Sequence, residues 1–380
     1  MNFSLDGDLE ILRQTARDFA ERELAPAAAR LDRERAFPAE AMRKMAEIGY
    51  LGMVVPEEFG GTALGNLALA VVLEELNRAC ASTGVTLSVH NSLVASPIVR
   101  FGTEDQKGRY LPRLSRGEIF GAYALTEPNA GSDAGSLRTR AEKKGDRWIL
   151  NGTKIWITSG DAAGLVIVYA RTDPEGGRGR GISAFLVESG FSGFRVGTKE
   201  HKMGIRASST VELLFENCEV PEGNLLGEEN EGFKVAMDTL DGGRIGIGAQ
   251  AVGIARACLE ASTKYARERV QFGRPIGKFQ AIQFKLADMA MEIDAARLLV
   301  HRAAWLRDQE VRCSKEAAMA KLFASRACNR AADEAVQIHG GAGYTTEFPV
   351  ERYFRDARIT EIYEGASDIQ RVVIARALLD

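Results

Sequence analysis

The chain has 380 residues, with 49 Lys and Arg against 52 Asp and Glu, so its formal net charge is −3. It lacks the basic excess of a nucleic-acid-binding protein, and 45% hydrophobic against 27% charged residues is the balance of a soluble globular protein. The length predicts two or three domains or lobes, enough to bury a sizeable core.

Three regions of different texture follow one another along the chain. Residues 1–121 show a helical pattern, broken by a turn at 56–61, and predict an N-terminal α-helical domain. Residues 122–231 are rich in strand-forming side chains and predict a middle β domain with a small antiparallel sheet. In residues 232–380, apolar side chains recur at spacings of four and three and predict a C-terminal four-helix domain. The predicted fold class is α+β, mainly α.

Several strands are expected in the middle region. The strand-like runs are 148–150, 154–158, 165–170, 184–187 and 211–216. Asn151-Gly152 stands between the first two runs and predicts the turn of a β-hairpin. The polar, Gly-rich residues 173–181 predict a loop.

Two glycine motifs imitate nucleotide-binding loops. Gly246-x-Gly248-x-x-Ala251 matches the dinucleotide fingerprint, but no strand precedes it and the helical stripe continues through it. We therefore expect a close helix–helix contact at these glycines. The segment 273–278 is one residue too short for a phosphate-binding loop and is followed by Phe279 where Ser or Thr is required. The Gly-x-Ser-x-Gly elbow of serine hydrolases does not occur in the sequence.

Residues suited to metal or thiol chemistry are few. The chain has four His and five Cys, without Cys-x-x-Cys or His-Glu-x-x-His spacing. We expect no metal site, and we expect the cysteines to be buried thiols in a reducing compartment. Residues 1–17 are acidic and lack an apolar core, which argues against a signal or transit peptide. Because the apolar runs are too short to cross a membrane, we expect no membrane insertion, and we expect a cytoplasmic protein or the mature form of a processed one.

Three segments carry candidate functional residues. Residues 123–136 are rich in Gly and hydroxyls, as in a loop that binds an acceptor-rich ligand or in a solvated domain connection. Consecutive glycines in 337–344 close a helix, either as an ordinary C-cap or as backbone pressed against a flat group. Glu364 stands between Tyr363 and Gly365 before a predicted helix. If desolvated, this carboxylate has a raised pKa and is a competent base, and the alternative is a surface Glu.

Five segments together resemble the acyl-CoA dehydrogenase family, and the resemblance covers essentially the whole chain. They are residues 125–136, 151–158, 269–280, 337–345 and 355–371. Residues 243–255 and 282–290 are most similar to the short-chain, butyryl-CoA branch. The resemblance implies the acyl-CoA dehydrogenase fold around FAD. It also implies α,β-dehydrogenation of an acyl-CoA thioester to a trans-2-enoyl-CoA, with electrons passed to an electron-transfer flavoprotein, in a homotetramer built as a dimer of dimers.

The resemblance also assigns roles residue by residue. Glu364 removes the α-proton, and Gly365 lines the acyl site. The β-domain wall of the flavin comprises Tyr123, Leu125, Thr126, Gly131, Ser132, Trp156, Ile157 and Thr158. FAD is further held by Arg269, Gln280, Gln337, Gly340 and Gly341 of the adjoining subunit, by Phe272, and by Ala366, Ser367 and Asp368 of the same chain. The CoA portion of the substrate contacts Ser132, Asp241 and Arg244.

Two departures narrow the substrate class. Long-chain and isovaleryl relatives place their base at the position of Gly243, which cannot act as one, so Glu364 is the expected base. Glutaryl-CoA relatives carry an Arg at the position aligned with Gly84, so a dicarboxylic acyl chain is not expected. The alternatives are a branched-chain or cyclic acyl-CoA dehydrogenase, an acyl-CoA oxidase, or a non-catalytic scaffold that retains the fold.

Overall fold

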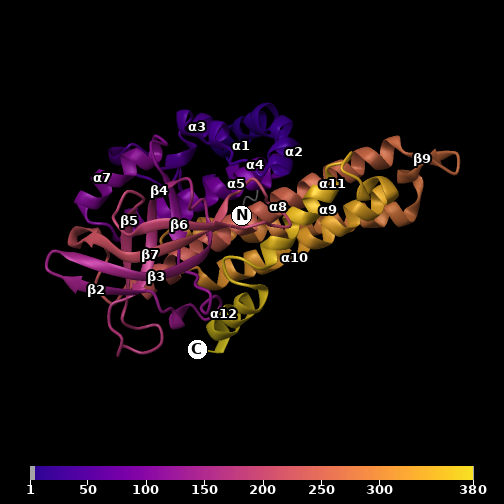
Figure 1. The fold of residues 1–380 in the computed structure, drawn as a ribbon. Helices are drawn as coiled ribbons and strands as arrows, with labels where there is room; N and C mark the ends of the chain where they lie inside the picture. The colour runs from indigo at the N-terminus through magenta and orange to yellow at the C-terminus, as the bar shows by residue number, and fades with distance from the viewer. Residues whose placement is uncertain (1–4, 380) are drawn as a thin grey trace.

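The computed structural model describes residues 5–379 and places N-terminal helices, a β-sheet and long C-terminal helices in that order (Figure 1). This arrangement confirms the predicted fold class. The N-terminal helices are α1 (Gly7–Phe19), α2 (Ala25–Glu34), α3 (Ala39–Glu47), α4 (Gly65–Ala79), α5 (Ala81–Ser88), α6 (Ser96–Phe101) and α7 (Glu104–Ser115). Of these, α4 is almost wholly buried, because its apolar side chains pack against the C-terminal helices as well as against α1.

The sheet is mixed rather than antiparallel, which corrects the predicted topology. Its strands run in the order β6-β7-β3-β2-β4-β5-β8, and β1 pairs with β4 in parallel. A parallel pair needs a long crossover, and here the chain leaves β1, makes the β2–β3 hairpin and only then enters β4. The strands are β1 (Phe120–Ala124), β2 (Arg140–Lys144), β3 (Arg147–Thr158), β4 (Ala163–Arg171), β5 (Ile182–Glu188), β6 (Phe194–Lys199), β7 (Thr210–Pro221) and β8 (Leu225–Leu226).

The predicted hairpin at Asn151-Gly152 is wrong. Both residues lie inside β3, and the turn is at 145–146, where Gly145 has a φ of +63°. A Cβ on Gly152 would lie 2.4 Å from the hydroxyl oxygen of Thr139, so the glycine allows a close approach of backbone at a register shift between β3 and β7. The predicted loop at 173–181 does connect β4 to β5.

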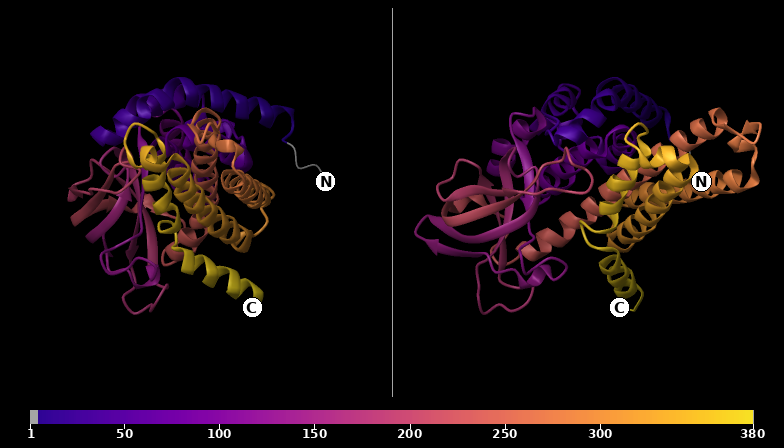
Figure 2. Two further views of the ribbon diagram at one scale, coloured as in Figure 1. Left: turned by 90° about the vertical axis from the view of Figure 1, so that its right-hand side faces the viewer. Right: turned by 45° about the vertical axis from the view of Figure 1, so that its right-hand side comes forward.

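The C-terminal helices are α8 (Gly232–Glu268), α9 (Gln280–Asp308), α10 (Ser314–His339), α11 (Val350–Arg358) and α12 (Ser367–Leu379). The small hairpin of β9 (Val270–Gln271) and β10 (Arg274–Pro275) joins α8 to α9 at the end of the molecule farthest from the sheet (Figures 1 and 2). Helix α8 is continuous through the glycine motif. A Cβ on Gly246 would lie 2.2 Å from the Ser88 hydroxyl, and one on Gly248 would lie 2.8 Å from a Val300 methyl. The expected close helix–helix contact is therefore confirmed.

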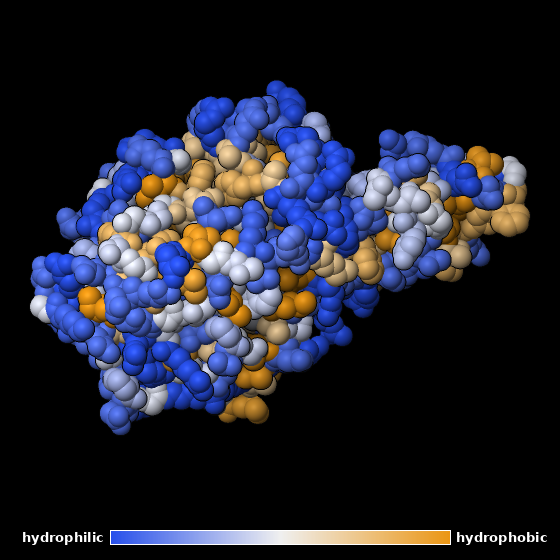
Figure 3. All heavy atoms as spheres, viewed as in Figure 1, coloured by the Kyte–Doolittle hydropathy of each residue, from blue (hydrophilic) through white to orange (hydrophobic). Residues whose placement is uncertain are grey.

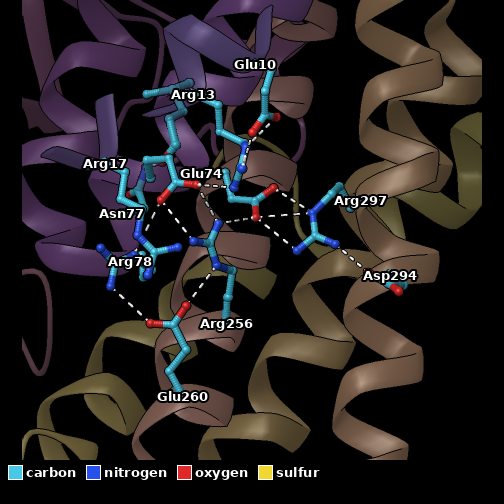
Figure 4. A network of polar contacts seen from close by, with 12 residues as sticks. Glu10, Arg13, Arg17, Glu74, Asn77, Arg78, Arg256, Glu260, Asp294 and Arg297 are labelled. Atoms are coloured by element: carbon cyan, nitrogen blue, oxygen red, sulfur yellow. Dashed lines mark hydrogen bonds and ion pairs between the residues drawn. The ribbon is translucent and has the colours of Figure 1, made fainter. Parts of the chain in front are cut away.

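A buried network of charges ties the N-terminal helices to the C-terminal ones (Figure 4). Glu74 and Glu75 on α4 accept from Arg256 on α8 at 2.8 and 2.7 Å, and Glu74 also pairs with Arg297 on α9 at 2.9 Å. Because each buried carboxylate has a guanidinium partner, the network fixes the relative positions of α4, α8 and α9.

Candidate active site

Glu364 lies in a strained turn just before α12. Its φ is +51° and that of Gly365 is +93°, so two successive residues adopt the left-handed region. That region suits glycine and is unfavourable for a glutamate, and such strain in an ordered segment is common at functional sites. The turn brings the Glu364 carboxylate against α8, where a Cβ built on Gly243 would lie only 2.1 Å from the Oε2 atom. Because Gly243 has no side chain, the Glu364 carboxylate can lie directly against the backbone of α8 at this position.

The carboxylate tip is removed from water although Glu364 as a whole is half-buried. Its Oε2 atom is buried and has no hydrogen-bond partner among residues 5–379. Burial raises the pKa of Glu364 to about 7, and the nearby cations of Lys321 and Arg244 oppose this rise. A carboxylate with this pKa is ionised to a large extent at neutral pH and holds a proton well once it has taken one, as a general base requires.

Asp241 and Arg244 form a buried ion pair on α8, next to Gly243. The guanidinium of Arg244 donates to Asp241 at 2.6 Å, and the Ser314 hydroxyl donates to the second oxygen of Asp241 at 2.5 Å. The carboxylate of Asp241 thus compensates the positive charge of Arg244. The Nε of Arg244 is nevertheless buried without an acceptor in the described part of the chain, so one N–H is left for a bound molecule.

The two segments of the predicted flavin wall are joined in space. The Lys154 ammonium on β3 is fully buried, donates to the Leu125 carbonyl at 3.0 Å and pairs with Glu127 at 2.7 Å. The Ile155 N–H donates to the Thr126 carbonyl at 2.9 Å. The residues Tyr123–Thr126 therefore lie beside Trp156–Thr158, while Gly131 and Ser132 lie on the exposed part of the same loop.

Trp156 is not the core residue that its place in a strand would suggest. Its side chain is 57% exposed and its φ is +61°, at the point where the register of β3 against β7 shifts. Its neighbours Ile157 and Thr158 are buried and half-buried. An exposed indole next to a hydroxyl-rich loop is suited to contact a flat, partly polar group.

A second group of predicted cofactor residues lies far from the first within one chain. Arg269 and Phe272 belong to the segment around the β9–β10 hairpin, and Gln280 begins α9. Residues 244–268 are continuous helix, so about 1.5 Å per residue puts the ends of this stretch roughly 36 Å apart. Gln337, Gly340 and Gly341 are exposed at the same remote end, where His339 stacks on Tyr265 with ring centroids 4.3 Å apart.

The remaining predicted contacts flank the base. Ala366 and Ser367 are half-buried at the start of α12, and the Ser367 hydroxyl donates to the Glu361 carbonyl at 3.4 Å. Asp368 is exposed and pairs with Arg371 at 2.6 Å. One chain thus brings Glu364 and Gly365, just before α12, against Gly243 and Arg244 of α8. The β9–β10 end of the molecule lies apart from α12 (Figures 1 and 2).

Sequence reasoning missed Lys321. This α10 lysine is fully buried and donates to the Gly365 carbonyl at 2.6 Å. A signal was present, because Lys321 falls on the apolar stripe formed by Ala317, Ala324 and Cys328 at helical spacing. A lysine on such a stripe is buried against the fold and needs a partner there.

The described residues contain neither a metal cluster nor a membrane-spanning helix. No group of three or more His, Cys, Asp and Glu in residues 5–379 is placed to hold a metal ion, and no helix within this range is long and apolar enough to cross a membrane. The predicted burial of the cysteines is confirmed for Cys80, Cys218, Cys258, Cys313 and Cys328.

The domain profiles of one family match this chain almost from end to end. The acyl-CoA dehydrogenase N-terminal, middle and C-terminal domains match residues 6–118, 122–218 and 230–379. The chain therefore belongs to the acyl-CoA dehydrogenase family, whose members are FAD-dependent oxidoreductases.

Its relatives include short-chain enzymes. The mitochondrial short-chain specific acyl-CoA dehydrogenase of Mus musculus is 55% identical over 370 residues, 97% of this chain and 90% of the relative. Butyryl-CoA dehydrogenase from Megasphaera elsdenii superposes with a TM-score of 0.98 at 46% identity, over all of both chains. A chain of the structure described as electron transferring flavoprotein of Acidaminococcus fermentans also has a TM-score of 0.98, at 51% identity and full coverage of both chains.

The contact between Gly243 and Glu364 predicts the effect of one added methyl group. Gly243→Ala places a Cβ 2.1 Å from the Oε2 atom of Glu364 and 2.8 Å from a methyl of Leu93. The carboxylate and the Leu93 methyl must therefore move, while alanine favours the helix more than glycine does. We expect flavin reduction by acyl-CoA to slow by about 10²-fold, in line with a displacement of about 1 Å, with the melting temperature maintained.

The matched control is Gly108→Ala on α7, where an added Cβ meets no atom within 4 Å. Both variants are compared by stopped-flow absorbance and by thermal unfolding. Full activity of Gly243→Ala would show that the carboxylate does not need this space.

Proposed function

We propose that this chain catalyses the FAD-dependent α,β-dehydrogenation of short-chain acyl-CoA thioesters to trans-2-enoyl-CoA. The observation that carries the proposal is the buried, unpartnered carboxylate of Glu364, held against Gly243. The short-chain preference is supported by the 55% identity to the mouse enzyme and by the likeness to butyryl-CoA dehydrogenase.

Glu364 takes the α-proton in this reaction. An α C–H is too weak an acid unless the negative charge on the thioester oxygen is stabilised as the proton leaves. In the family this stabilisation includes the backbone N–H of the catalytic Glu, so the strained turn at Glu364 and Gly365 orients both the base and a hydrogen-bond donor. FAD, held by the residues named below, would supply the acceptor for the hydride that leaves the β-carbon. Gly365 lines the acyl site.

The residues around the β-domain loop fit a flavin. The exposed indole of Trp156 offers a flat apolar surface, and the buried ion pair of Lys154 and Glu127 fixes the neighbouring loop. Tyr123, Leu125, Thr126, Gly131, Ser132, Ile157 and Thr158 would complete this wall, with Ala366, Ser367 and Asp368 at the start of α12. Asp241, Arg244 and Ser132 would contact the substrate.

The remote residues support a site shared between subunits. Arg269, Phe272, Gln280, Gln337, Gly340 and Gly341 would hold the FAD of a neighbouring copy, since they lie far from the wall of their own chain. Phe272 is 93% exposed, and apolar residues reach the surface around the protruding β9–β10 end (Figure 3). Val270 of the same hairpin is also exposed, and apolar side chains exposed together, unlike single ones, mark a surface for a partner.

Helix α9 supports the homotetramer, a dimer of dimers. Its exposed apolar residues recur every seven positions, which places them along one face of the helix. They are Phe284 (62% exposed), Met291 (64%), Leu298 (47%) and Trp305 (52%). We call this set the α9 stripe, and we assign it to a contact between copies of the chain.

An electron-transfer flavoprotein is the proposed redox partner. The resemblance implies it, and the structure described as electron transferring flavoprotein of Acidaminococcus fermentans contains a chain of the same fold.

The cytoplasmic location stays a prediction of the sequence.

The role of Glu364 predicts the behaviour of Glu364→Gln. The amide keeps the shape of the side chain but cannot take a proton, so FAD and butyryl-CoA should still bind while anaerobic bleaching of the flavin falls by at least about 10³-fold. Flavin absorbance is followed after mixing with butyryl-CoA.

Glu347→Gln, on an exposed residue, is the control and should react like the unmodified enzyme. Retained bleaching in Glu364→Gln would show that another base exists. A purified protein that takes up no FAD would instead favour the non-catalytic scaffold.

The acyl preference predicts the order of kcat/KM in a substrate panel. We expect kcat/KM for butyryl-CoA to exceed that for octanoyl-CoA and isobutyryl-CoA by about tenfold or more. One methylene misfitted in an apolar pocket changes the barrier by about 1–3 kcal/mol, or 10–200-fold; octanoyl-CoA has a longer chain than butyryl-CoA, and isobutyryl-CoA is branched. Isobutyryl-CoA as the best substrate would establish the branched-chain alternative. Peroxide release under air at the rate of turnover would establish an oxidase.

The α9 stripe predicts the effect of a charge on assembly. Met291→Glu places a carboxylate in the middle of the stripe, so we expect a smaller mass by light scattering and a loss of FAD from the separated copies. Ile48→Glu, at an exposed apolar residue at the end of α3, is the control and should keep the native mass. An unchanged mass of Met291→Glu would place the contact elsewhere.

A further inference from the structure

Lys321 is a buried cation without a carboxylate partner. Its side chain is fully buried in α10, and no Asp or Glu among residues 5–379 lies within ion-pair distance of it. Its ammonium donates instead to the carbonyl oxygen of Gly365 at 2.6 Å. Burying an ammonium is unfavourable unless it is well bonded, so packing alone does not account for a lysine here.

The carbonyl that Lys321 contacts belongs to the turn that presents the base. Gln370, buried on α12, donates to the same Gly365 carbonyl at 2.7 Å and to the Glu364 carbonyl at 3.3 Å. Two donors from different helices therefore fix the backbone between Glu364 and Gly365. Left-handed residues keep such a conformation only where the surroundings hold them.

Lys321 also faces the base electrostatically. The charged and titratable groups near Glu364 and Lys321 are Arg244 on α8, Tyr123 on β1, Tyr363 in the turn and Glu361 in the preceding 3-10 turn. Burial lowers the pKa of Lys321 to about 8, with Glu364 opposing this, so the side chain is mostly cationic at neutral pH. Among these groups, Lys321 and Arg244 are the cations that lower the pKa of Glu364, and Arg244 is already paired with Asp241.

We propose that Lys321 is a positioning residue for the base: its ammonium holds the Gly365 carbonyl so that the turn aims the Glu364 carboxylate, and its charge favours the carboxylate over the carboxylic acid. This inference rests on the proposed function, since it assigns Glu364 as the base. It separates two contributions of one side chain, a hydrogen bond to backbone and a positive charge.

Lys321→Gln and Lys321→Met separate the two contributions. Gln keeps a hydrogen-bond donor without the charge, and Met removes both at similar length. We measure the rate of anaerobic flavin bleaching by butyryl-CoA against pH in the FAD-loaded enzyme, together with the Kd of butyryl-CoA. In both variants we expect the pH midpoint to rise by about one unit, because a nearby cation that lowered the pKa of Glu364 is gone.

The plateau rate at high pH should distinguish the variants. Lys321→Met should fall about tenfold or more through misplacement of the carboxylate, while Lys321→Gln should fall less, with the Kd kept in both. Lys315→Met, at a half-exposed lysine of the same helix, is the matched control and should keep both midpoint and plateau.

A second readout does not depend on turnover. The carboxyl stretch that Glu364→Gln removes from the infrared spectrum can be titrated in each variant, and its midpoint should rise in parallel. A folded, FAD-containing Lys321→Met with the midpoint of the unmodified enzyme in both titrations would overturn the proposal. Should Lys321→Met not retain FAD, the midpoint of Lys321→Gln decides in the same way. If butyryl-CoA bleaches not even the unmodified enzyme while the infrared midpoint of the variants still rises, the proposed function fails, and what remains is that Lys321 orients the Glu364 carboxylate and lowers its pKa.

Discussion

The chemistry that we propose for this protein depends on a carboxylate whose Oε2 atom is buried without a hydrogen-bond partner among residues 5–379. Glu364 is driven toward its neutral form by burial, and the cations of Lys321 and Arg244 oppose this drive, so that its pKa settles near neutrality, at about 7. The carboxylate fits at this place because Gly243 has no side chain. It points there because the backbone at Glu364 and Gly365 adopts the left-handed conformation.

The three parts of the fold have to be held firmly for such a balance to persist. Helix α8 carries Gly243 and Arg244 in its first half, so any shift of α8 against its neighbours would change the surroundings of the Glu364 carboxylate. The buried network of Glu74, Glu75 and Arg256 with its partners fixes α8 against α4. On the side of the sheet, the ammonium of Lys154 fixes the loop that would face the flavin, because it bonds to Leu125 and Glu127 of that loop.

The proposed reaction also explains why a chain with only four His and five Cys can be an enzyme. One carboxylate and an organic cofactor suffice for a proton and a hydride that leave adjacent carbons, so the reaction we propose needs no metal ion from the protein. The near-neutral net charge is consistent with an acyl-CoA substrate, because the anionic CoA portion requires only local cations and N–H groups. In the assembly that we propose, a second copy would complete the site, with its β9–β10 end at the flavin and the α9 stripe in the contact between copies.

The sequence alone determined the order of helical, strand and helical regions, the family, and Glu364 as the candidate base, because periodicity and short motifs are local properties. It did not determine that β1 joins the sheet in parallel, that Asn151 and Gly152 lie within β3, or that Trp156 is exposed. Nor did it show that Gly243 makes room for Glu364, or that Lys321 bonds to a carbonyl 44 positions away. These are contacts between segments distant in sequence. Which side chains meet, and which of them lose water, is decided only when the helices and the sheet pack together.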